Sequence, residues 1–168
     1  MAVKPKSRIR KASKGDILQR KGEYNSKIYF VRKGLLRSFA IDKKGREHVF
    51  MFAPERWTLG DASAATEPCE FFIDAIEDTE FIAYEKDVER DATVKGFLGV
   101  VERLKTLEKR TLMMMSVSAL ERYEHFEKTY PELVQRVSQR MIASYLGITP
   151  EALSKLRGER AKSRKQSS

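Results

Sequence analysis

Residues 139–158 read QRMIASYLGITPEALSKLRG, and this pattern determines the expected fold of the C-terminal part of the chain. Its spacing predicts two short helices joined by a tight turn. The helices would cross near Ala143, where a small side chain is needed. Gly147 would end the first helix, because glycine adopts a left-handed conformation without strain. Thr149 can cap the second helix and Pro150 suits its first position. The sequence therefore predicts a helix-turn-helix.

The second helix of this pair is expected to run from Pro150 to about Arg157. The seam between the helices would be filled by Ile142, Leu146, Ile148, Leu153 and Leu156. The opposite face carries side chains that can read base edges in the DNA major groove, and the start of the first helix suits phosphates. The candidate DNA contacts are Gln139, Arg140, Thr149, Glu151, Ser154, Lys155 and Arg157. An ordinary helical hairpin with the same spacing by chance is the alternative.

The net charge of +9 is concentrated at the two ends of the chain. Residues 1–14 contain six basic residues and no acidic one, and residues 135–168 contain eight basic and two acidic residues. A basic tail alone is usually a solvated end, so it supports nucleic-acid binding only beside a folded reader. The length of 168 residues, 41% of them hydrophobic, fits a soluble globular protein with one sensor domain and one small helical domain.

Several classes of protein are disfavoured by what the sequence lacks. No apolar run approaches the ~20 residues that cross a bilayer, so we expect a cytoplasmic protein with no membrane partner. A single cysteine, Cys69, forms neither an internal disulfide nor a metal cage, and is expected to be a small buried hydrophobe. His48 and His125 would lie in different domains, so no metal site, catalytic pair or cofactor is predicted.

Short apolar runs alternate with turn signals from Gly15 to about Lys86, which is typical of a sandwich or barrel. At least six strands are expected in this part, with an irregular stretch at residues 58–68. The basic segment from Lys4 to Lys14 is expected to form an arm outside the barrel.

A long helix is predicted from about Thr93 to Met115. Its wide apolar face is formed by Phe97, Val100, Val101, Leu104, Leu107, Thr111 and Met114. A helix of this length spans ~30 Å, so part of the face would overhang its own domain and be covered by the same helix of a second copy. Packing on its own β domain alone is the alternative. Shorter helices are expected at Ala119–Thr129 and from about Ser138.

Nearly the whole chain resembles the Crp/Fnr family of bacterial transcription regulators. The resemblance is carried by KGDILQRKGEYNSKIYFVRKGLLRSF, by DKKGRE at a hairpin, by Gly60-Asp61 and by AIEDTEFIAY. The C-terminal ERYEHFEKTYPELVQRVSQRMIASYLGITPEALSKLRGE is especially similar to a branch of the family common in Bacteroidetes.

This resemblance implies an α+β fold with three parts: a β-barrel or jelly-roll sensor domain like those that bind cyclic nucleotides (residues 1–92), a long dimerisation helix (93–116) and a helix-turn-helix domain (117–168). It implies a homodimer that binds palindromic double-stranded DNA under the control of a small-molecule effector. Activation of transcription would also require RNA polymerase as a partner, but the sequence identifies no surface for it.

The sequence departs from the family pattern at the effector pocket. The resemblance places the pocket at Gly60, Asp61, Ala62, Ser63, Cys69 and Glu70. Members that bind cyclic nucleotides hold the ribose with a Glu and the phosphate with an Arg. Here the acid position is either Asp61 or empty, and the expected Arg falls at about Cys69. A cyclic phosphate would lose a bidentate contact, so we expect no tight cyclic AMP binding.

Two other departures concern cofactors and DNA contacts. Cys69 alone cannot hold the iron–sulfur cluster of oxygen-sensing members. Only ten residues follow Gly158, so the β-hairpin wing of many members is not expected here and phosphate contacts would be fewer.

Two other functional classes fit the sequence less well. An enzyme is disfavoured because no nucleophile–base pair or histidine-rich metal site is visible. A signalling module that has lost specific DNA binding, and uses its C-terminal helices for a protein partner, is the main alternative. Salt dependence separates this module from a DNA-binding regulator, because DNA binding must weaken steeply as salt rises.

Overall fold

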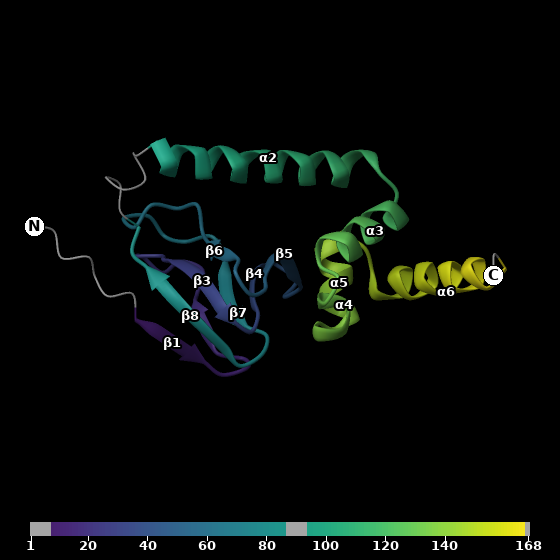
Figure 1. Cartoon of the computed structure of the whole chain (residues 1–168), viewed down its shortest axis with the longest axis horizontal. Coiled ribbons are helices and arrows are strands. Elements are labelled where there is room, and N and C mark those ends of the chain that lie inside the picture. Colours follow the sequence, from purple (N-terminus) through teal and green to yellow (C-terminus); the bar gives the residue numbers. More distant parts are fainter. Residues whose placement is uncertain (1–7, 87–93, 167–168) are drawn as a thin grey trace, which may run out of the picture. The chain divides into compact units, whose positions relative to one another are not determined.

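The computed structural model describes residues 8–86 and 94–166, without the side chains of residues 94–100, 103 and 163–166. The chain divides into two compact units, Met1–Ala92 and Thr93–Ser168. The first is built from strands and the second from helices (Figure 1). Neither unit contains, among the described residues, a helix long and apolar enough to span a membrane.

The β unit consists of two four-stranded antiparallel sheets, which together form a jelly-roll-like fold. The strands of the first sheet, in spatial order, are β1 (Ile9–Ala12), β8 (Thr79–Tyr84), β3 (Ile28–Lys33) and β6 (Thr58–Gly60). The strands of the second are β2 (Ile17–Gln19), β7 (Phe72–Ala75), β4 (Leu36–Ile41) and β5 (Glu47–Ala53).

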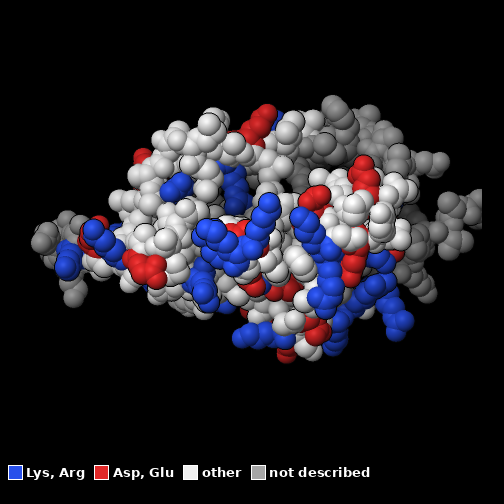
Figure 2. All heavy atoms as spheres, turned by 180° about the vertical axis from the view of Figure 1, so that it is seen from behind, with Lys and Arg blue, Asp and Glu red and all other residues white. Residues whose placement is uncertain are grey.

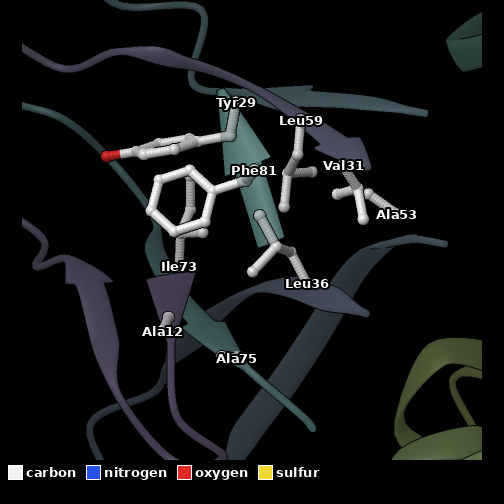
Figure 3. Packing of buried hydrophobic residues seen from close by; sticks show 9 residues of the cluster. All are labelled: Ala12, Tyr29, Val31, Leu36, Ala53, Leu59, Ile73, Ala75 and Phe81. Atoms are coloured by element: carbon white, nitrogen blue, oxygen red, sulfur yellow. The ribbon is translucent and has the colours of Figure 1, made fainter. Parts of the chain in front are cut away.

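The core of the β unit lies between the inner faces of the two sheets (Figure 3). Tyr29 and Phe81 meet edge to face, with ring centroids 5.7 Å apart, and pack beside Ile73. The remaining cluster members are Ala12, Val31, Leu36, Ala53, Leu59 and Ala75. Alternation along each strand places these residues inward, which is why the short apolar runs of the sequence form strands rather than helices.

One turn of the β unit requires glycine. Gly34 joins β3 to β4 with φ of +93°, a value that L side chains rarely adopt. A Cβ atom there would also lie 2.6 Å from the Asp78 carbonyl oxygen and 2.6 Å from Thr79 Oγ1. Thr79 is buried and its hydroxyl accepts the Leu35 N–H at 3.1 Å, so this corner is closed by backbone and side chain together.

The expectation of a basic arm from Lys4 to Lys14 is wrong for its second half. Residues Ile9–Ala12 form β1, which pairs with β8 from Ile9↔Ile82 to Ala12↔Thr79. Ala12 is buried in the core, and Lys11 lies 3.2 Å from Glu80 across the pair. The long-range partner β8 therefore orders a segment that looks like a solvated tail in sequence. Residues 1–7 lie outside the described residues.

The helical unit contains five described helices. These are α2 (Val94–Ser116), α3 (Ala119–Thr129), α4 (Leu133–Arg136), α5 (Gln139–Leu146) and α6 (Pro150–Gln166). Ser118 begins α3 with a capping box, because its hydroxyl accepts the Glu121 N–H while the Glu121 carboxylate accepts the Ser118 N–H. The bounds of α2 and α3 match the sequence expectations.

An aromatic cluster holds α3, α4 and α5 together. The rings of Phe126, Tyr130 and Tyr145 lie with centroids 5.4 to 5.9 Å apart, and Leu133 is buried at 1% exposure. Burial raises the pKa of the Tyr130 hydroxyl. This small core belongs to the helical unit alone.

The end of α6 corrects a second expectation. The helix was expected to stop near Arg157, but it continues to Gln166. Arg160 forms an ion pair with Glu127 of α3, and its Nε lies 3.9 Å from Glu124. These contacts hold the extension, and the Ala, Lys, Arg and Gln residues that follow are good helix formers.

Candidate functional site

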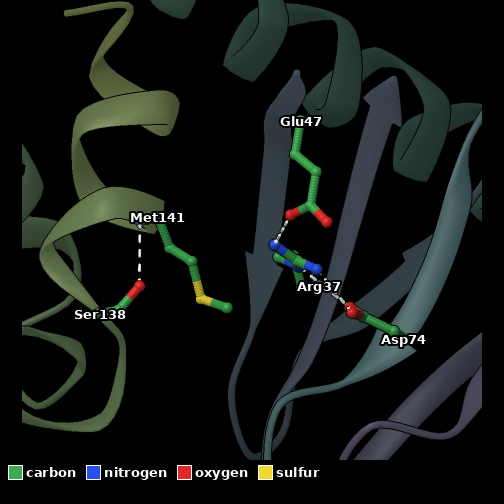
Figure 4. A network of polar contacts seen from close by, with 5 residues as sticks. All are labelled: Arg37, Glu47, Asp74, Ser138 and Met141. Atoms are coloured by element: carbon green, nitrogen blue, oxygen red, sulfur yellow. Dashed lines mark hydrogen bonds and ion pairs between the residues drawn. The ribbon is translucent and has the colours of Figure 1, made fainter. Parts of the chain in front are cut away.

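Local capping builds the helix pair α5 and α6. The Ser138 hydroxyl accepts the Met141 N–H at 3.3 Å and so begins α5 (Figure 4). Gly147 ends it in the left-handed conformation, with φ of 68° and ψ of 32°. Thr149 Oγ1 then accepts the Ala152 N–H at 3.2 Å at the start of α6. The expected roles of Gly147 and Thr149 are confirmed.

The seam between α5 and α6 is apolar and closed. Ile142, Leu146 and Leu153 are fully buried, as is Ala143 at the crossing. Ile148 and Leu156, which were expected in the same seam, are half-buried. The two helices therefore pack on one face and leave the other face of α6 to solvent.

The predicted DNA-contact residues lie where the sequence placed them. Gln139 and Arg140 occupy the first turn of α5, Thr149 the turn, and the others α6. Arg157 is half-buried. The other six are exposed: Gln139, Arg140, Thr149, Glu151, Ser154 and Lys155. Lys155 Nζ lies 4.0 Å from Glu159, and both side chains are largely exposed, so this pair contributes little.

Acidic and basic side chains are interspersed over the face of the molecule in Figure 2. On α6 the exposed bases Lys155 and Lys162 alternate with the exposed acids Glu151 and Glu159. Hydrogen bonds from its own backbone N–H and from the Thr149 hydroxyl lower the pKa of Glu151, which keeps it a hydrogen-bond acceptor at neutral pH. Recognition by this helix would thus depend on hydrogen-bond geometry as well as on positive charge.

The long helix α2 contacts α5 within the helical unit, which the sequence did not predict. The Arg110 guanidinium lies 4.2 Å from the Tyr145 ring centroid and donates to the Tyr145 carbonyl at 3.4 Å. One turn further along, the Met114 Cε atom approaches Gly147 so closely that an added Cβ would lie 2.6 Å from it. A displacement of α2 would therefore change the contact between Met114 and the α5–α6 turn.

The loop after β6 forms the second candidate site. Asp61 is 6% exposed, and its carboxylate accepts three backbone N–H groups, from Ser63 at 2.7 Å, Glu70 at 2.8 Å and Phe71 at 3.1 Å. Burial alone would raise the pKa of Asp61, but these hydrogen bonds outweigh it and the pKa is lowered. Asp61 thus closes its own loop, residues 61–71, which we call the cassette loop.

A lysine that the sequence analysis did not single out braces the same loop. Lys86 Nζ donates to the Asp61 carbonyl at 2.8 Å, to the Ser26 hydroxyl at 2.6 Å and to the Ser63 carbonyl. It comes two residues after β8 and 25 residues after Asp61, so its contact with the loop could not be predicted from the sequence. Its charge is satisfied by the oxygens of the loop.

The other predicted pocket residues divide between the inside and the surface. Gly60 and Cys69 are buried, Ser63 is half-buried, and Ala62 and Glu70 are exposed. Cys69 Sγ donates to the Arg20 carbonyl at 2.8 Å, and burial raises the pKa of its thiol. Cys69 behaves as the small buried residue expected, and it supplies no positive charge to the loop.

A buried ion pair crosses the second sheet (Figure 4). Arg37 of β4 donates from Nε and Nη2 to the two carboxylate oxygens of Asp74 of β7, at 3.0 and 2.6 Å. It also donates to Glu47 of β5 at 2.7 Å. Burial acts to lower the pKa of Arg37, but the two carboxylates outweigh it and raise that pKa.

The described residues offer no cluster of metal ligands. They contain no group of three or more histidine, cysteine or acidic side chains that could hold a metal ion. His48 Nε2 lies 3.0 Å from Asp42 on an exposed hairpin, and His125 contacts Thr129 in the helical unit.

Comparison with known proteins defines the β unit. The family model of the cyclic nucleotide-binding domain matches residues 9–92, and the chain belongs to this family. No curated protein matches the chain.

Similar solved structures cover both units. FixK2 from Bradyrhizobium japonicum is 19% identical, with a TM-score of 0.78 over 93% of this chain and 85% of that one. A transcriptional regulator of the CRP/FNR family from Thermus thermophilus is 16% identical, with a TM-score of 0.72 over 93% and 87%. The c-di-GMP-responsive regulator CLP from Xanthomonas campestris is 15% identical, with a TM-score of 0.68 over 94% and 87%. The chain thus shares its fold with these three proteins, one of which is described as a regulator of the CRP/FNR family.

Proposed function

We propose that this protein is a cytoplasmic transcription regulator of the Crp/Fnr type that binds palindromic DNA as a homodimer through a helix-turn-helix formed by α5 and α6. The observation that carries the proposal is the capped helix pair with a closed apolar seam and an exposed polar face on α6. The fold shared with CRP/FNR regulators over more than nine-tenths of the chain supports it. The proposal includes no enzymatic activity.

Exposed apolar residues on α2 support the homodimer. Leu104, Leu112 and Met115 are 55%, 63% and 80% exposed, which is unusual for large apolar side chains on one helix. A second copy of α2 would cover them and bring two α6 helices to one DNA duplex. The expected face residues Phe97 and Val100 lie outside the described side chains.

The DNA-binding proposal is tested by selecting sites from a random DNA library and titrating the best site at two salt concentrations. A palindrome with half-sites about one helical turn apart, ~34 Å, is expected. Affinity should fall steeply with salt because Lys and Arg side chains release counterions from DNA. Failure to enrich any sequence at either salt would favour the alternative of a protein-binding module.

Matched variants assign the reading face. Lys155→Ala and Glu151→Ala should each cost ~1–3 kcal/mol of discrimination at one base position. Lys128→Ala, an exposed lysine in the last turn of α3, is the control and should leave affinity and sequence preference unchanged. Equal weakening on all DNA sequences by the α6 variants would contradict base reading by these residues.

The dimer is tested separately by sedimentation of Leu104→Glu and Met115→Glu. Each places a charge where a second copy of α2 would pack, so both variants should sediment as monomers while keeping their helical content. Lys105→Ala is the control, because Lys105 is exposed and pairs with Glu102 on its own helix. A wild-type protein that is monomeric at micromolar concentration would contradict the homodimer.

A further inference from the structure

Two polar atoms buried in the β unit have no hydrogen-bond partner among the described residues. They are Oε1 of Gln19 and Oγ of Ser38, on side chains that are each only 3% exposed. The Gln19 amide is oriented unambiguously, because its Nε2 donates to the Phe71 carbonyl at 2.9 Å and an amide oxygen could not do so. Orphaned buried acceptors are rare in folded proteins because each costs free energy.

Both residues lie beside Ile73 in the second sheet. Gln19 lies opposite Ile73 in the β2–β7 pair, and Ser38 lies opposite the same Ile73 in the β4–β7 pair. Residues directly opposed in an antiparallel pair project to the same face. Because Ile73 belongs to the buried core, Gln19 and Ser38 flank it on the inner face, with their backbones about 10 Å apart at ordinary strand spacing.

The row formed by Gln19, Ile73 and Ser38 adjoins the cassette loop. The Phe71 carbonyl accepts from Gln19, and the Phe71 N–H donates to Asp61. A molecule beside Gln19 would therefore touch the segment of chain that Asp61 and Lys86 close.

The charges around this row determine which chemical class of small molecule could bind there. The Asp61 carboxylate is satisfied by three N–H groups, and the Lys86 ammonium donates to three oxygens. Cys69 contributes no cation, and the exposed residues Glu67 and Glu70 are acidic. A phosphate or carboxylate entering here would meet no uncommitted positive group on the described part of the loop, whereas an uncharged N–H or O–H donor would satisfy Oε1 of Gln19.

Space for such a molecule can be made at Met51. Both orphaned atoms are buried. Met51 lies opposite Ser38 in the β4–β5 pair and is a partly buried neighbour of the core. Methionine has three rotatable bonds and adapts readily, so its movement could open the interior beside Ser38.

We propose that the effector is a small uncharged molecule with at least one N–H or O–H donor, bound between the sheets by Gln19 and Ser38 rather than by a phosphate contact. This inference rests on the proposed function only in calling the molecule an effector, because binding to the β unit is measured without DNA.

The first test is whether the Ser38 hydroxyl is orphaned in the unliganded protein. Ser38→Ala should raise the midpoint of thermal unfolding, since it removes a buried hydroxyl that has no partner among the described residues. Ser26→Ala is the matched control and should lower it, because the buried Ser26 hydroxyl accepts from Lys86. A lower midpoint for Ser38→Ala would show that this hydroxyl is already bonded and would overturn the proposal.

The second test measures the class of ligand directly. A fragment library of matched carboxamides and carboxylates is screened by ligand-observed NMR against the full chain and against the Gln19→Leu/Ser38→Ala double variant. We expect carboxamide hits that bind about tenfold more tightly than their carboxylate partners and that the double variant loses. The proposal would be overturned if carboxylates bind more tightly than carboxamides, if no fragment binds, or if the double variant retains the hits. A wild-type protein that does not bind DNA would refute the proposed regulator function without altering these outcomes.

Discussion

Two glycines eleven positions apart in the helical unit should respond in opposite directions to the same substitution. Gly147 has φ of 68°, so alanine there must adopt a left-handed conformation that costs about 1–2 kcal/mol. Its Cβ would also lie 2.6 Å from the end of the flexible Met114 side chain, which must shift. Gly158 lies inside α6 with ordinary helical geometry and nothing within 4 Å of an added Cβ. Alanine at 158 should stabilise the unit by about 0.5–1 kcal/mol.

The assay is urea unfolding followed by two probes. Circular dichroism at the helix band reports mainly on the helical unit, and the fluorescence of the single tryptophan, Trp57, reports on the β unit. Gly147→Ala should lower the helical midpoint and Gly158→Ala should raise it, a separation of roughly 1.5–3 kcal/mol between the variants. The Trp57 transition serves as the internal control.

Equal effects of the two substitutions would refute the assignment of Gly147 as a left-handed helix end. Gly158→Ala also bears on function, because the exposed face of α6 includes Gly158. A variant that is more stable but binds DNA less tightly would locate the duplex against the helix backbone at this position.

Three further predictions concern the β unit. The pKa of Asp61 is lowered by folding, so its carboxylate stabilises the fold above about pH 4 and that contribution is lost as the pH falls through the folded-state pKa; Asp61→Asn should flatten the acid limb of a stability–pH curve, and an unchanged limb would contradict this. Asp74→Ala should cost about 3–5 kcal/mol in urea unfolding because it removes the carboxylate that accepts two hydrogen bonds from the buried Arg37. Glu47→Ala, at a half-exposed partner, should cost about 1 kcal/mol or less, and similar losses would refute the ranking. Calorimetry should detect no cyclic AMP binding below a millimolar dissociation constant, since Cys69 replaces the expected arginine; a submillimolar constant would overturn this expectation.

Features encoded locally were predictable from the sequence, whereas features that depend on distant partners were not. The ends of α5 and the start of α6 follow from Ser138, Gly147 and Thr149, each of which acts on backbone within four residues. The segment Ile9–Ala12 forms a strand only because β8 lies beside it, and α6 extends because Glu127 of α3 receives Arg160. Neither partner can be inferred from spacing.

The candidate pocket shows the same division. The family resemblance identified Asp61, but the three N–H groups that occupy its carboxylate come partly from nine and ten residues away. Lys86 reaches the loop from 25 residues beyond Asp61. The shared row of Gln19 and Ser38 exists only through the register of three strands. The sequence thus located the loop but could not show that its charged groups already have hydrogen-bond partners.

The pairing of β1 with β8 has a consequence for how the protein is made. Ile9 and Ile82 are neighbours in the sheet although most of the β unit separates them in sequence. During synthesis the first strand must therefore wait, unpaired, until the last strand has left the ribosome, and closure of so long a loop is slow. The β unit can therefore be completed only when the chain that leads into α2 emerges from the ribosome. A nascent chain truncated before Thr79 should be protease-sensitive throughout, whereas a chain released after Tyr84 should resist the protease.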